Sequence, residues 1–428
     1  MLVLSHPTGN ANARAAALGL LQAGHLTSFQ TSIATFPGDG LDRLSALPGL
    51  GELRRRRFDP ALKDVTAMWP WREAGRLLAS RAGLRSLTRH ERGAFCVDAV
   101  YRSLDRHIAQ GLSKAGAAGA GAAVYAYEDG ALASFEAARS LGIARLYDLP
   151  IGYWRAARRL LDAEQVRWPE WQSTLTGFLD SDEKLARKDQ ELRLADRIFV
   201  ASSFTRQTLA DFPGPLAPVD VIPYGFPAVV GARAHAPLAG RPLKLLFVGG
   251  LSQRKGVADL FAAVRALGKH VELTVVGAKA VEGNAALDAA LAAHRWIPSL
   301  PHDAILKLMR EHDVFVFPSL FEGFGLVITE AMSQGTPVIT TDRTAGPDLI
   351  EHGRNGWLVE AGNTAALQAS IENLLRHPEQ VAAAGREAME TARRRPWEVY
   401  GHELAEAVAR TLNDTARHAP AVVRGHHA

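Results

Sequence analysis

Short apolar runs separated by helical patterns recur along the whole chain. In the first half, the runs that predict buried strands are Leu2–Leu4, Val124–Tyr127, Arg145–Tyr147, Ile198–Ala201 and Val219–Ile222. In the second half they are residues 245–248, 272–276, 314–317, 338–340 and 356–359. Strands that alternate with helices are typical of parallel sheets. The pattern therefore predicts an α/β fold.

A cluster of glycines and prolines between Pro223 and Leu243 interrupts this alternation, which then starts afresh. The 428 residues are also more than one α/β core usually contains. We therefore expect two Rossmann-like, doubly wound parallel-sheet domains facing a cleft, at residues 1–225 and 226–399.

Three segments depart from the alternation. Residues 51–106 contain Arg54–Arg57 and several further arginines, and we interpret them as an irregular helical insertion. Its arginines allow two readings, a surface for anionic lipid or simply solvated helix faces. The glycine- and alanine-rich residues 116–123 predict a loop, and the polar tail from Arg417 predicts disorder.

The composition limits the class of protein. Hydrophobic residues make up 47% of the chain and charged residues 22%, which is typical of a soluble globular protein. Neither a membrane-spanning run nor a leader segment stands out, so we expect a cytoplasmic protein. Cys96 is the single cysteine, which excludes an internal disulfide and a multi-cysteine metal site. The net charge of +4 is small for this length, and we expect no nucleic-acid partner.

Several common catalytic patterns are absent from the sequence. No Gly-x-Gly-x-x-Gly lies between a strand and a helix, and the phosphate-loop, Gly-x-Ser-x-Gly and His-Glu-x-x-His patterns do not occur. Asp180-Ser181-Asp182 has the spacing of an Asp-x-Asp metal motif but lies in a charged stretch that predicts a helix start. We expect no metal.

The densest chemical signal is the segment Phe317–Met332. A strand ends there, a glycine-bearing loop turns, and a helix is predicted to begin near Phe324–Leu326. Free backbone N–H groups at a helix start bind anions and hydroxyls. Glu322 and Glu330 are eight residues apart, a little over two helical turns, so two carboxylates on one side of that helix could hold an extended ligand.

This segment resembles the acidic Glu-x7-Glu motif of the retaining glycosyltransferase family 4, whose members have the GT-B fold. The similarity extends to Phe247–Gly256, Asp313–Ser319, Gly346–Ile350 and Asn355–Val359, and more weakly to Ala195–Ser202 and Val221–Gly225. It implies metal-independent transfer of a hexose from a nucleotide-diphosphate sugar to an acceptor hydroxyl, with retention of anomeric configuration.

The resemblance also implies a donor site in the second half of the chain. Glu330 would hold the ribose, while Glu322 with Phe324, Gly325 and Leu326 would hold the hexose. Gly323 belongs to the same set. Lys255 would bind the diphosphate. An arginine usually follows the first glycine of this loop, where this chain has Gly250; either Arg254 or backbone donors replace it.

The first half would supply the acceptor side and part of the catalytic set. Gly9 and Asn10 occupy the place of a glycine-bearing loop that approaches the donor phosphates. Asp148 stands where many relatives have a histidine, and its charge could stabilise an oxocarbenium-like centre. We expect Asp148, Lys255 and Glu322 to be catalytic. Glu128 and Asp129 would either bind acceptor hydroxyls or serve as ordinary loop acids.

The remaining expectations concern partners and alternatives. The acceptor would be a glycan, a lipid-linked compound or a small molecule in glycan, glycolipid or polysaccharide biosynthesis, with no cofactor and with peripheral contact to an anionic membrane as one option. Pro396–Tyr400 resembles a late family segment, which implies that residues 400–428 return to the first domain. The rival hypotheses are a nucleotide-sugar epimerase and a non-catalytic sugar-nucleotide-binding protein.

Overall fold

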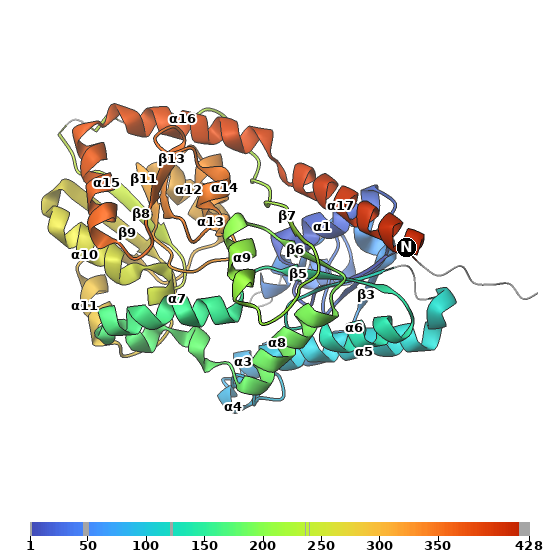
Figure 1. The fold of residues 1–428 in the computed structure, drawn as a ribbon. Helices are drawn as coiled ribbons and strands as arrows, with labels where there is room; N and C mark the ends of the chain where they lie inside the picture. The colour runs from blue at the N-terminus through green and yellow to red at the C-terminus, as the bar shows by residue number, and fades with distance from the viewer. Residues whose placement is uncertain (1, 46–50, 120–122, 236, 239, 419–428) are drawn as a thin grey trace, which may run out of the picture.

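The computed structural model describes residues 2–45, 51–119, 123–235, 237–238 and 240–418. Two sheets lie side by side, one in each half of the chain, and every pair of neighbouring strands is parallel (Figure 1). The seven-stranded sheet with its helices is called the first lobe, and the six-stranded sheet with its helices the second lobe. The predicted α/β fold with two parallel sheets is confirmed.

The sheet of the first lobe has the strand order β3-β2-β1-β4-β5-β6-β7. Its strands are β1 Leu2–Ser5, β2 Leu26–Thr31, β3 Thr66–Met68, β4 Ala123–Tyr127, β5 Ala144–Leu149, β6 Arg197–Val200 and β7 Val219–Val221. The central strand β4 is buried at every position, as expected where helices cover both faces of a sheet. β2 and β3 were not predicted, and β3 lies inside the segment interpreted as an insertion.

The sheet of the second lobe has the strand order β10-β9-β8-β11-β12-β13. Its strands are β8 Leu243–Val248, β9 Val271–Val276, β10 Arg295–Ile297, β11 Val314–Phe317, β12 Val338–Thr341 and β13 Gly356–Val359. β11 and β12 are buried throughout and form the centre of the core. The short edge strand β10 was not predicted.

Helices cover both sheets. The α-helices are α1 Ala11–Gln22, α2 Gly40–Leu44, α3 Trp71–Arg81, α4 Arg85–Thr88, α5 Val97–Gly119, α6 Leu132–Ser140, α7 Trp154–Arg167, α8 Asp182–Leu194, α9 Ser203–Thr208, α10 Val257–Leu267, α11 Ala285–Ala292, α12 His302–Glu311, α13 Leu326–Ser333, α14 Gly346–Leu349, α15 Thr364–Arg376, α16 Glu379–Arg394 and α17 Trp397–His418. The 3-10 helices are η1 Gly51–Arg56, η2 Pro60–Val65, η3 Pro169–Thr174, η4 Thr176–Leu179, η5 Leu209–Asp211, η6 Gln253–Lys255 and η7 Gly268–His270. Among the described residues, no helix combines the length and apolarity needed to cross a membrane.

Two local expectations change. The loop expected at residues 116–123 is in part helical, because α5 continues to Gly119 across a break at Gly116, where φ is 66°. Residues 120–122 of that loop lie outside the described residues. So does most of the tail from Arg417 that was expected to be disordered, since the description ends at His418.

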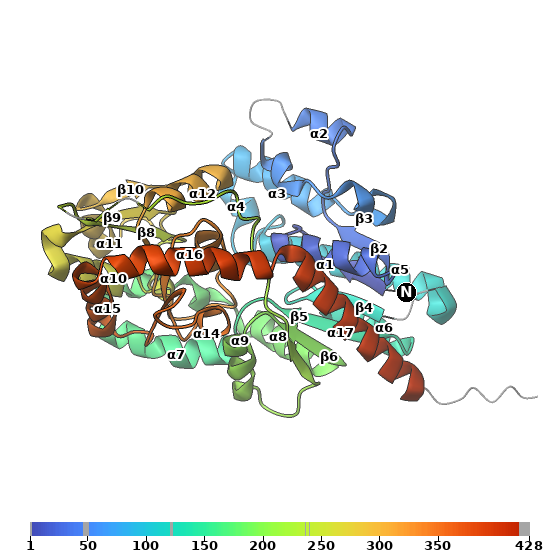
Figure 2. The same cartoon turned by 90° about the horizontal axis from the view of Figure 1, so that it is seen from above.

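The chain leaves the first lobe after β7, in a segment that includes residues 224–226 and is called the first crossing. It returns between α16 and α17 in the second crossing, and the two crossings touch. Phe226 N donates to Arg395 O at 2.9 Å, and a Cβ on Gly225 would lie 2.4 Å from Trp397 Cα. α17 then packs along α1 in the first lobe, as both views show (Figures 1 and 2). The domain boundary expected after residue 225 falls in the first crossing. The boundary expected after residue 399 falls inside α17. Both boundaries stay predictions.

Candidate functional site

A cavity of about 280 Å³ opens between the lobes at the carboxyl ends of β8 and β11. Asn10, Asn12, Pro150 and Tyr224 line it from the first lobe and the first crossing. The second lobe contributes Val248, Gly249, Gly250, Lys255, Phe317, Glu322, Phe324, Gly325, Leu326 and Val327. Ligands of open parallel sheets bind at this end of the strands, which makes the cavity the candidate site.

Two cations converge on one carboxylate beside this cavity. Arg254 and Lys255 lie on η6, the short helix that follows β8. Arg254 Nη1 donates to Glu322 Oε1 at 3.2 Å, and Lys255 Nζ contacts Glu322 Oε2. The Lys255 ammonium also lies 5.0 Å from the centre of the Phe317 ring. The cluster therefore has one more positive than negative charge.

Burial makes this excess charge significant. Burial and the neighbouring Arg254 guanidinium lower the pKa of Lys255, and the ion pair with Glu322 opposes that effect. Burial also lowers the pKa of Arg254. Charge is costly in a poorly solvated site unless it is paired. An anionic ligand would supply the second counter-charge that the protein itself lacks here.

The start of α13 forms the opposite wall. Its N-cap is Gly325, whose φ of 88° favours glycine, and a Cβ there would lie 3.0 Å from the Phe317 ring. No side chain caps the helix, so backbone N–H groups of its first turn are available where Leu326 and Val327 line the cavity. These groups and the helix dipole add to the preference for an anion.

Glu330 lies on α13 one turn after Leu326, but it does not line the cavity. Its Oε1 is 3.1 Å from Nε2 of His302, and this contact raises the pKa of His302. The structure thus brings Lys255 into contact with Glu322 and places Glu330 beside the start of α12. The role of Glu330 at the donor ribose stays a prediction.

Two predicted glycines have clear packing reasons. A Cβ on Gly323 would lie 1.8 Å from Pro150 O, and Gly323 O accepts from Ser202 Oγ at 2.5 Å, so Gly323 joins the two lobes. At Gly9, φ is 60° and a Cβ would lie 2.2 Å from the Phe58 ring. Neither residue lines the cavity, whereas Asn10 and Gly250 do.

His6 fixes the loop that presents Asn10. Its Nδ1 accepts from Gly9 N at 2.8 Å. Burial, with the charges of Arg56 and Arg14, lowers the pKa of His6 to about 3. The imidazole is therefore neutral near pH 7, as an acceptor at Nδ1 must be.

Asp148 belongs to β5 rather than following it, because the strand extends through Leu149. Its side chain is buried, and Tyr125 OH donates to its Oδ2 at 2.6 Å. Burial raises the pKa of Asp148 to about 7, so a large fraction is protonated at neutral pH. Asp148 does not line the cavity, and its catalytic role stays a prediction.

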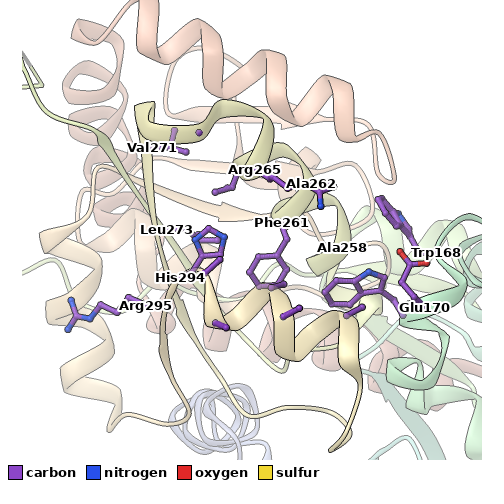
Figure 3. Close-up of a pocket in the computed structure, with 18 of the residues that line it drawn as sticks. Trp168, Glu170, Ala258, Phe261, Ala262, Arg265, Val271, Leu273, His294 and Arg295 are labelled. Atoms are coloured by element: carbon purple, nitrogen blue, oxygen red, sulfur yellow. The ribbon is translucent and has the colours of Figure 1, made fainter.

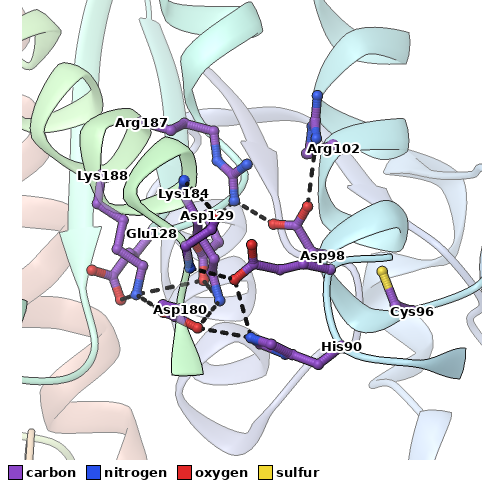
Figure 4. Close-up of polar contacts among 12 residues, drawn as sticks. His90, Cys96, Asp98, Arg102, Glu128, Asp129, Asp180, Lys184, Arg187 and Lys188 are labelled. Atoms are coloured by element: carbon purple, nitrogen blue, oxygen red, sulfur yellow. Dashed lines mark hydrogen bonds and ion pairs between the residues drawn. The ribbon is translucent and has the colours of Figure 1, made fainter. Parts of the chain in front are cut away.

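Glu128 and Asp129 follow β4 and form part of an ion-pair network with α8 (Figure 4). Lys188 Nζ lies 3.4 Å from Glu128 Oε2, and Arg187 Nη2 lies 3.3 Å from Asp129 Oδ1. Burial is the main cause that raises the pKa of Glu128 to about 7. Both acids contact cations of the protein, as ordinary structural acids do.

The helix start predicted at Asp180-Ser181-Asp182 is confirmed. Ser181 is the N-cap of α8, and its hydroxyl accepts from Lys184 N. Asp180 lies 3.0 Å from Lys184 Nζ and 3.0 Å from His90 Nε2.

Seven residues of the cavity wall had not been named as site residues: Asn12, Pro150, Tyr224, Val248, Gly249, Phe317 and Val327. Asn12 and Tyr224 are hydrogen-bonded to each other. Asn12 Nδ2 donates to Tyr224 OH at 3.1 Å, and the Tyr224 ring lies 4.8 Å from the Phe324 ring. They join α1, the first crossing and the α13 loop. Tyr224 lies within Val221–Gly225, which had already been singled out by resemblance, whereas Asn12 carried no signal of its own.

A larger cavity, of about 780 Å³, lies between α10 and α11 of the second lobe and residues 168–171 of the first half of the chain (Figure 3). Alanines and the rings of Trp168, Trp171, Phe261 and His294 dominate its wall. The Phe261 and His294 rings stack 5.6 Å apart. No cluster of unbalanced charge like that at Lys255 occurs among the residues of this wall, so its size does not make it the candidate site.

Part of the chain matches a known protein family and several characterised proteins. Residues 232–391 match the family described as glycosyl transferases group 1. Glycogen synthase of Mycobacterium tuberculosis H37Rv is 30% identical over 263 residues, 58% of this chain and 59% of that protein. Phosphatidyl-myo-inositol mannosyltransferase of Mycobacterium leprae is 34% identical over 188 residues, 41% of this chain and 50% of that protein. The chain thus matches less than two thirds of the length of these relatives.

Solved structures show the same fold over nearly the whole chain. Sucrose-phosphate synthase of Thermosynechococcus elongatus has a TM-score of 0.64 at 17% identity and covers 96% of this chain and 99% of its own. Anabaena HepE in complex with UDP and glucose has a TM-score of 0.61 at 16% identity, with 96% and 99% covered. The chain therefore has the GT-B fold, and its residues 232–391 match the family described as glycosyl transferases group 1.

Proposed function

We propose that the protein is a retaining glycosyltransferase of family 4 that moves a hexose from a nucleoside-diphosphate sugar to an acceptor hydroxyl. The observation that carries this proposal is the partly buried excess of positive charge at Lys255 and Arg254, beside a cavity lined by both lobes. A diphosphate matches that charge. The solved complex of Anabaena HepE with UDP-glucose, which shares this fold, supports the choice of ligand.

Donor binding would rearrange the cluster at Glu322. The diphosphate would take over Lys255 and Arg254 as partners, which frees the Glu322 carboxylate to accept from hexose hydroxyls. Backbone N–H groups at the start of α13 would bind further phosphate or hexose oxygens. Glu330, one turn along the same helix, would leave His302 and hold the ribose.

In the reaction, the acceptor oxygen would bond to the anomeric carbon on the face from which the phosphate departs. The carbon–oxygen bond to the phosphate breaks, its electron pair stays with the nucleoside diphosphate, and a donor phosphate oxygen takes the acceptor proton. Lys255 and Arg254 would stabilise the charge that develops on the departing diphosphate, so no metal and no covalent intermediate are required.

The acceptor belongs to polysaccharide or glycolipid synthesis in this proposal. The names of the relatives support both classes, glycogen synthase for the first and phosphatidyl-myo-inositol mannosyltransferase for the second. Asn10, Asn12 and Tyr224 are the groups of the first lobe and first crossing that would face such an acceptor across the cavity.

The test is a thermal-shift titration with uridine, guanosine and adenosine diphosphate sugars. We expect one nucleotide to stabilise the wild type, and the shift to shrink at equal ligand concentration in Lys255→Ala and Glu330→Ala. Lys269→Ala, at an exposed lysine of η7, is the control and should respond like the wild type. Undiminished binding in both site variants would overturn the proposed site.

A second measurement separates transfer from its rivals. Release of nucleoside diphosphate in the presence of an acceptor pool, with an α-configured product from an α-configured donor, is expected. Exchange of a sugar-carbon proton without release would identify an epimerase instead. Binding with no release at all would identify a non-catalytic protein.

A further inference from the structure

Exposed apolar side chains are concentrated on one segment of the first lobe. Among the described residues, eight large hydrophobic side chains are exposed, and five of them lie between residues 68 and 97. These are Met68, Trp71, Leu78, Leu84 and Val97. Trp71 is 68% exposed and Leu78 70%. Such a concentration in 30 residues of a 428-residue chain marks an interaction surface.

The geometry of α3 turns two of these side chains to the same side. Trp71 and Leu78 are seven residues apart, close to two turns, so they project from one helix face. Glu73 on the opposite face holds the helix in place, because it is buried in an ion pair with Arg56. Phe95 also packs against α3, since a Cβ on Gly75 would lie 2.4 Å from its ring. The exposure of Trp71 and Leu78 is therefore built into a firmly packed helix.

Leu84 lies just past the end of α3. Its backbone N–H donates to Ala79 O at 2.9 Å, which fixes the turn that leads into α4. Leu84 is 49% exposed. Both α3 and α4 lie at the lower edge of the molecule in Figure 1 and on the opposite side of the first lobe from α17 in Figure 2.

The same segment is strongly basic. Residues 68–97 contain six arginines against two glutamates, a formal net charge of +4 that equals the net charge of the whole chain. The carboxylate of Glu73 already pairs with Arg56 and Arg76. Arg85, Arg89 and Arg92 are exposed, and within the described ranges no carboxylate lies at ion-pair distance from them.

We propose that this α3–α4 surface, formed by Trp71, Leu78, Leu84, Arg85, Arg89 and Arg92, docks on an anionic membrane. Tryptophan and leucine side chains that project singly from a helix insert at the level of the lipid headgroups. Arginines beside them meet lipid phosphates, each contributing to an attraction that falls within a Debye length of the bilayer. None of these residues lines the cavity near Lys255, so the surface is separate from the proposed donor site.

The experiment is sedimentation of the full chain with sucrose-loaded vesicles of phosphatidylcholine alone or with 30% phosphatidylglycerol. We expect pelleting with the anionic vesicles, little with the neutral ones, and release as NaCl rises from 50 to 500 mM. Because each basic residue near an anionic surface changes partitioning about fivefold, Arg85→Ala/Arg89→Ala/Arg92→Ala should lower it on the order of 100-fold. Trp71→Ser/Leu78→Ser should also lower it.

Matched controls change the same chemistry on other surfaces. Val166→Ser, at an 84% exposed valine of α7, and Arg376→Ala, at an exposed arginine of α15, should pellet like the wild type. Thermal shift with the nucleotide should be unchanged in all variants, so a failure here is distinct from failure of the donor site. No pelleting with anionic vesicles, or equal pelleting of Trp71→Ser/Leu78→Ser, would overturn the proposal. Concentration-dependent dimers that Leu78→Ser abolishes would also overturn it and assign the surface to a second copy.

Discussion

Two clusters of charged side chains in this protein differ in the balance of positive and negative charge. In the network of Figure 4, each of Asp98, Glu128, Asp129 and Asp180 contacts at least one of the cations Arg102, Lys184, Arg187 and Lys188. His90 adds a contact to Asp180 and one to Glu91. At the cavity, two cations share the single carboxylate of Glu322. In the network of Figure 4 the charges of the protein compensate one another, and the ion pairs connect the end of β4 to α8. Beside the cavity one positive charge stays uncompensated among the described residues, so an anionic ligand can compensate it.

The pKa directions reflect the same contrast. Burial lowers the pKa of Lys188, but Glu128, Asp129 and Asp180 outweigh it, and the net shift is upward. For Lys255 the net shift is downward, because burial and Arg254 act together. Charge on Lys188 is thus stabilised by the fold itself, and charge on Lys255 would gain from a ligand.

The largest expected effect breaks the balanced network. Lys188→Met leaves Glu128 and Asp129 with one cation fewer in a buried setting, so we expect the free energy of unfolding to fall by about 3–5 kcal/mol. Urea denaturation of the wild type and the variant measures the difference in the free energy of unfolding. The affinity of the remaining folded protein for the nucleotide should not change. A loss below about 1 kcal/mol would mean that the network contributes little, since surface ion pairs have that size.

Replacing the lysine at the cavity by methionine should lower the affinity for the nucleotide and leave the stability nearly unchanged. Lys255→Met removes a cation that would bind the diphosphate, so affinity for the nucleotide should fall roughly 10- to 150-fold. Stability should change by less than about 1 kcal/mol, the size of an exposed ion pair, because this cluster is partly exposed and Arg254 still pairs with Glu322. Isothermal titration calorimetry and urea denaturation give the two values. Equal losses of stability in both lysine variants would remove the distinction between the clusters.

The sequence predicted more of the residues that meet at the cavity than of the ion pairs in the network of Figure 4. Gly250, Lys255, Glu322, Phe324, Gly325 and Leu326, with Asn10, line the cavity as expected of a common site. Their blocks have a fixed order along the chain, and parallel strands bring loops at their carboxyl ends together. Glu128 and Asp129 were ambiguous, because their partners lie more than 50 residues away on α8 and no local pattern identifies them.

The missed elements have local causes. β2 interleaves polar residues with Leu26 and Phe29, and β3 and β10 have three residues each, too few for a periodic pattern. The strand predicted at Arg145–Tyr147 ends one residue before Asp148, whereas β5 continues through Leu149. The hydrogen bond from Tyr125 and the raised pKa of Asp148 explain why the strand tolerates this residue.

The third prediction concerns the pH dependence of stability and tests the raised pKa of Asp148. The pKa of Asp148 is about 7 in the folded protein and near 3.8 unfolded, so the folded state binds more protons between these values. Its contribution to stability is therefore present below pH 4 and is lost as the pH rises toward 7. Asp148→Asn keeps the acceptor for Tyr125 and removes the titration. From pH 5 to 8 the wild type should lose about 2 kcal/mol more than the variant. Equal changes with pH in the free energy of unfolding of the wild type and the variant, measured by urea denaturation, would contradict the raised pKa of Asp148.

The smallest effect adds charge to the unbalanced cluster. Gly250 lines the cavity, its φ is not in the left-handed region, and a Cβ there would meet nothing within 4 Å. Gly250→Arg can therefore be accommodated and places a third cation at the loop position where relatives usually carry an arginine. We expect affinity for the nucleotide to rise about fivefold at low salt, about 1 kcal/mol, and the gain to shrink as salt is added. Gly250→Ala is the control for the backbone and should bind like the wild type. If Gly250→Arg bound more weakly while Gly250→Ala did not, Arg254 and Lys255 would already balance the diphosphate, and the cluster would be complete as it stands.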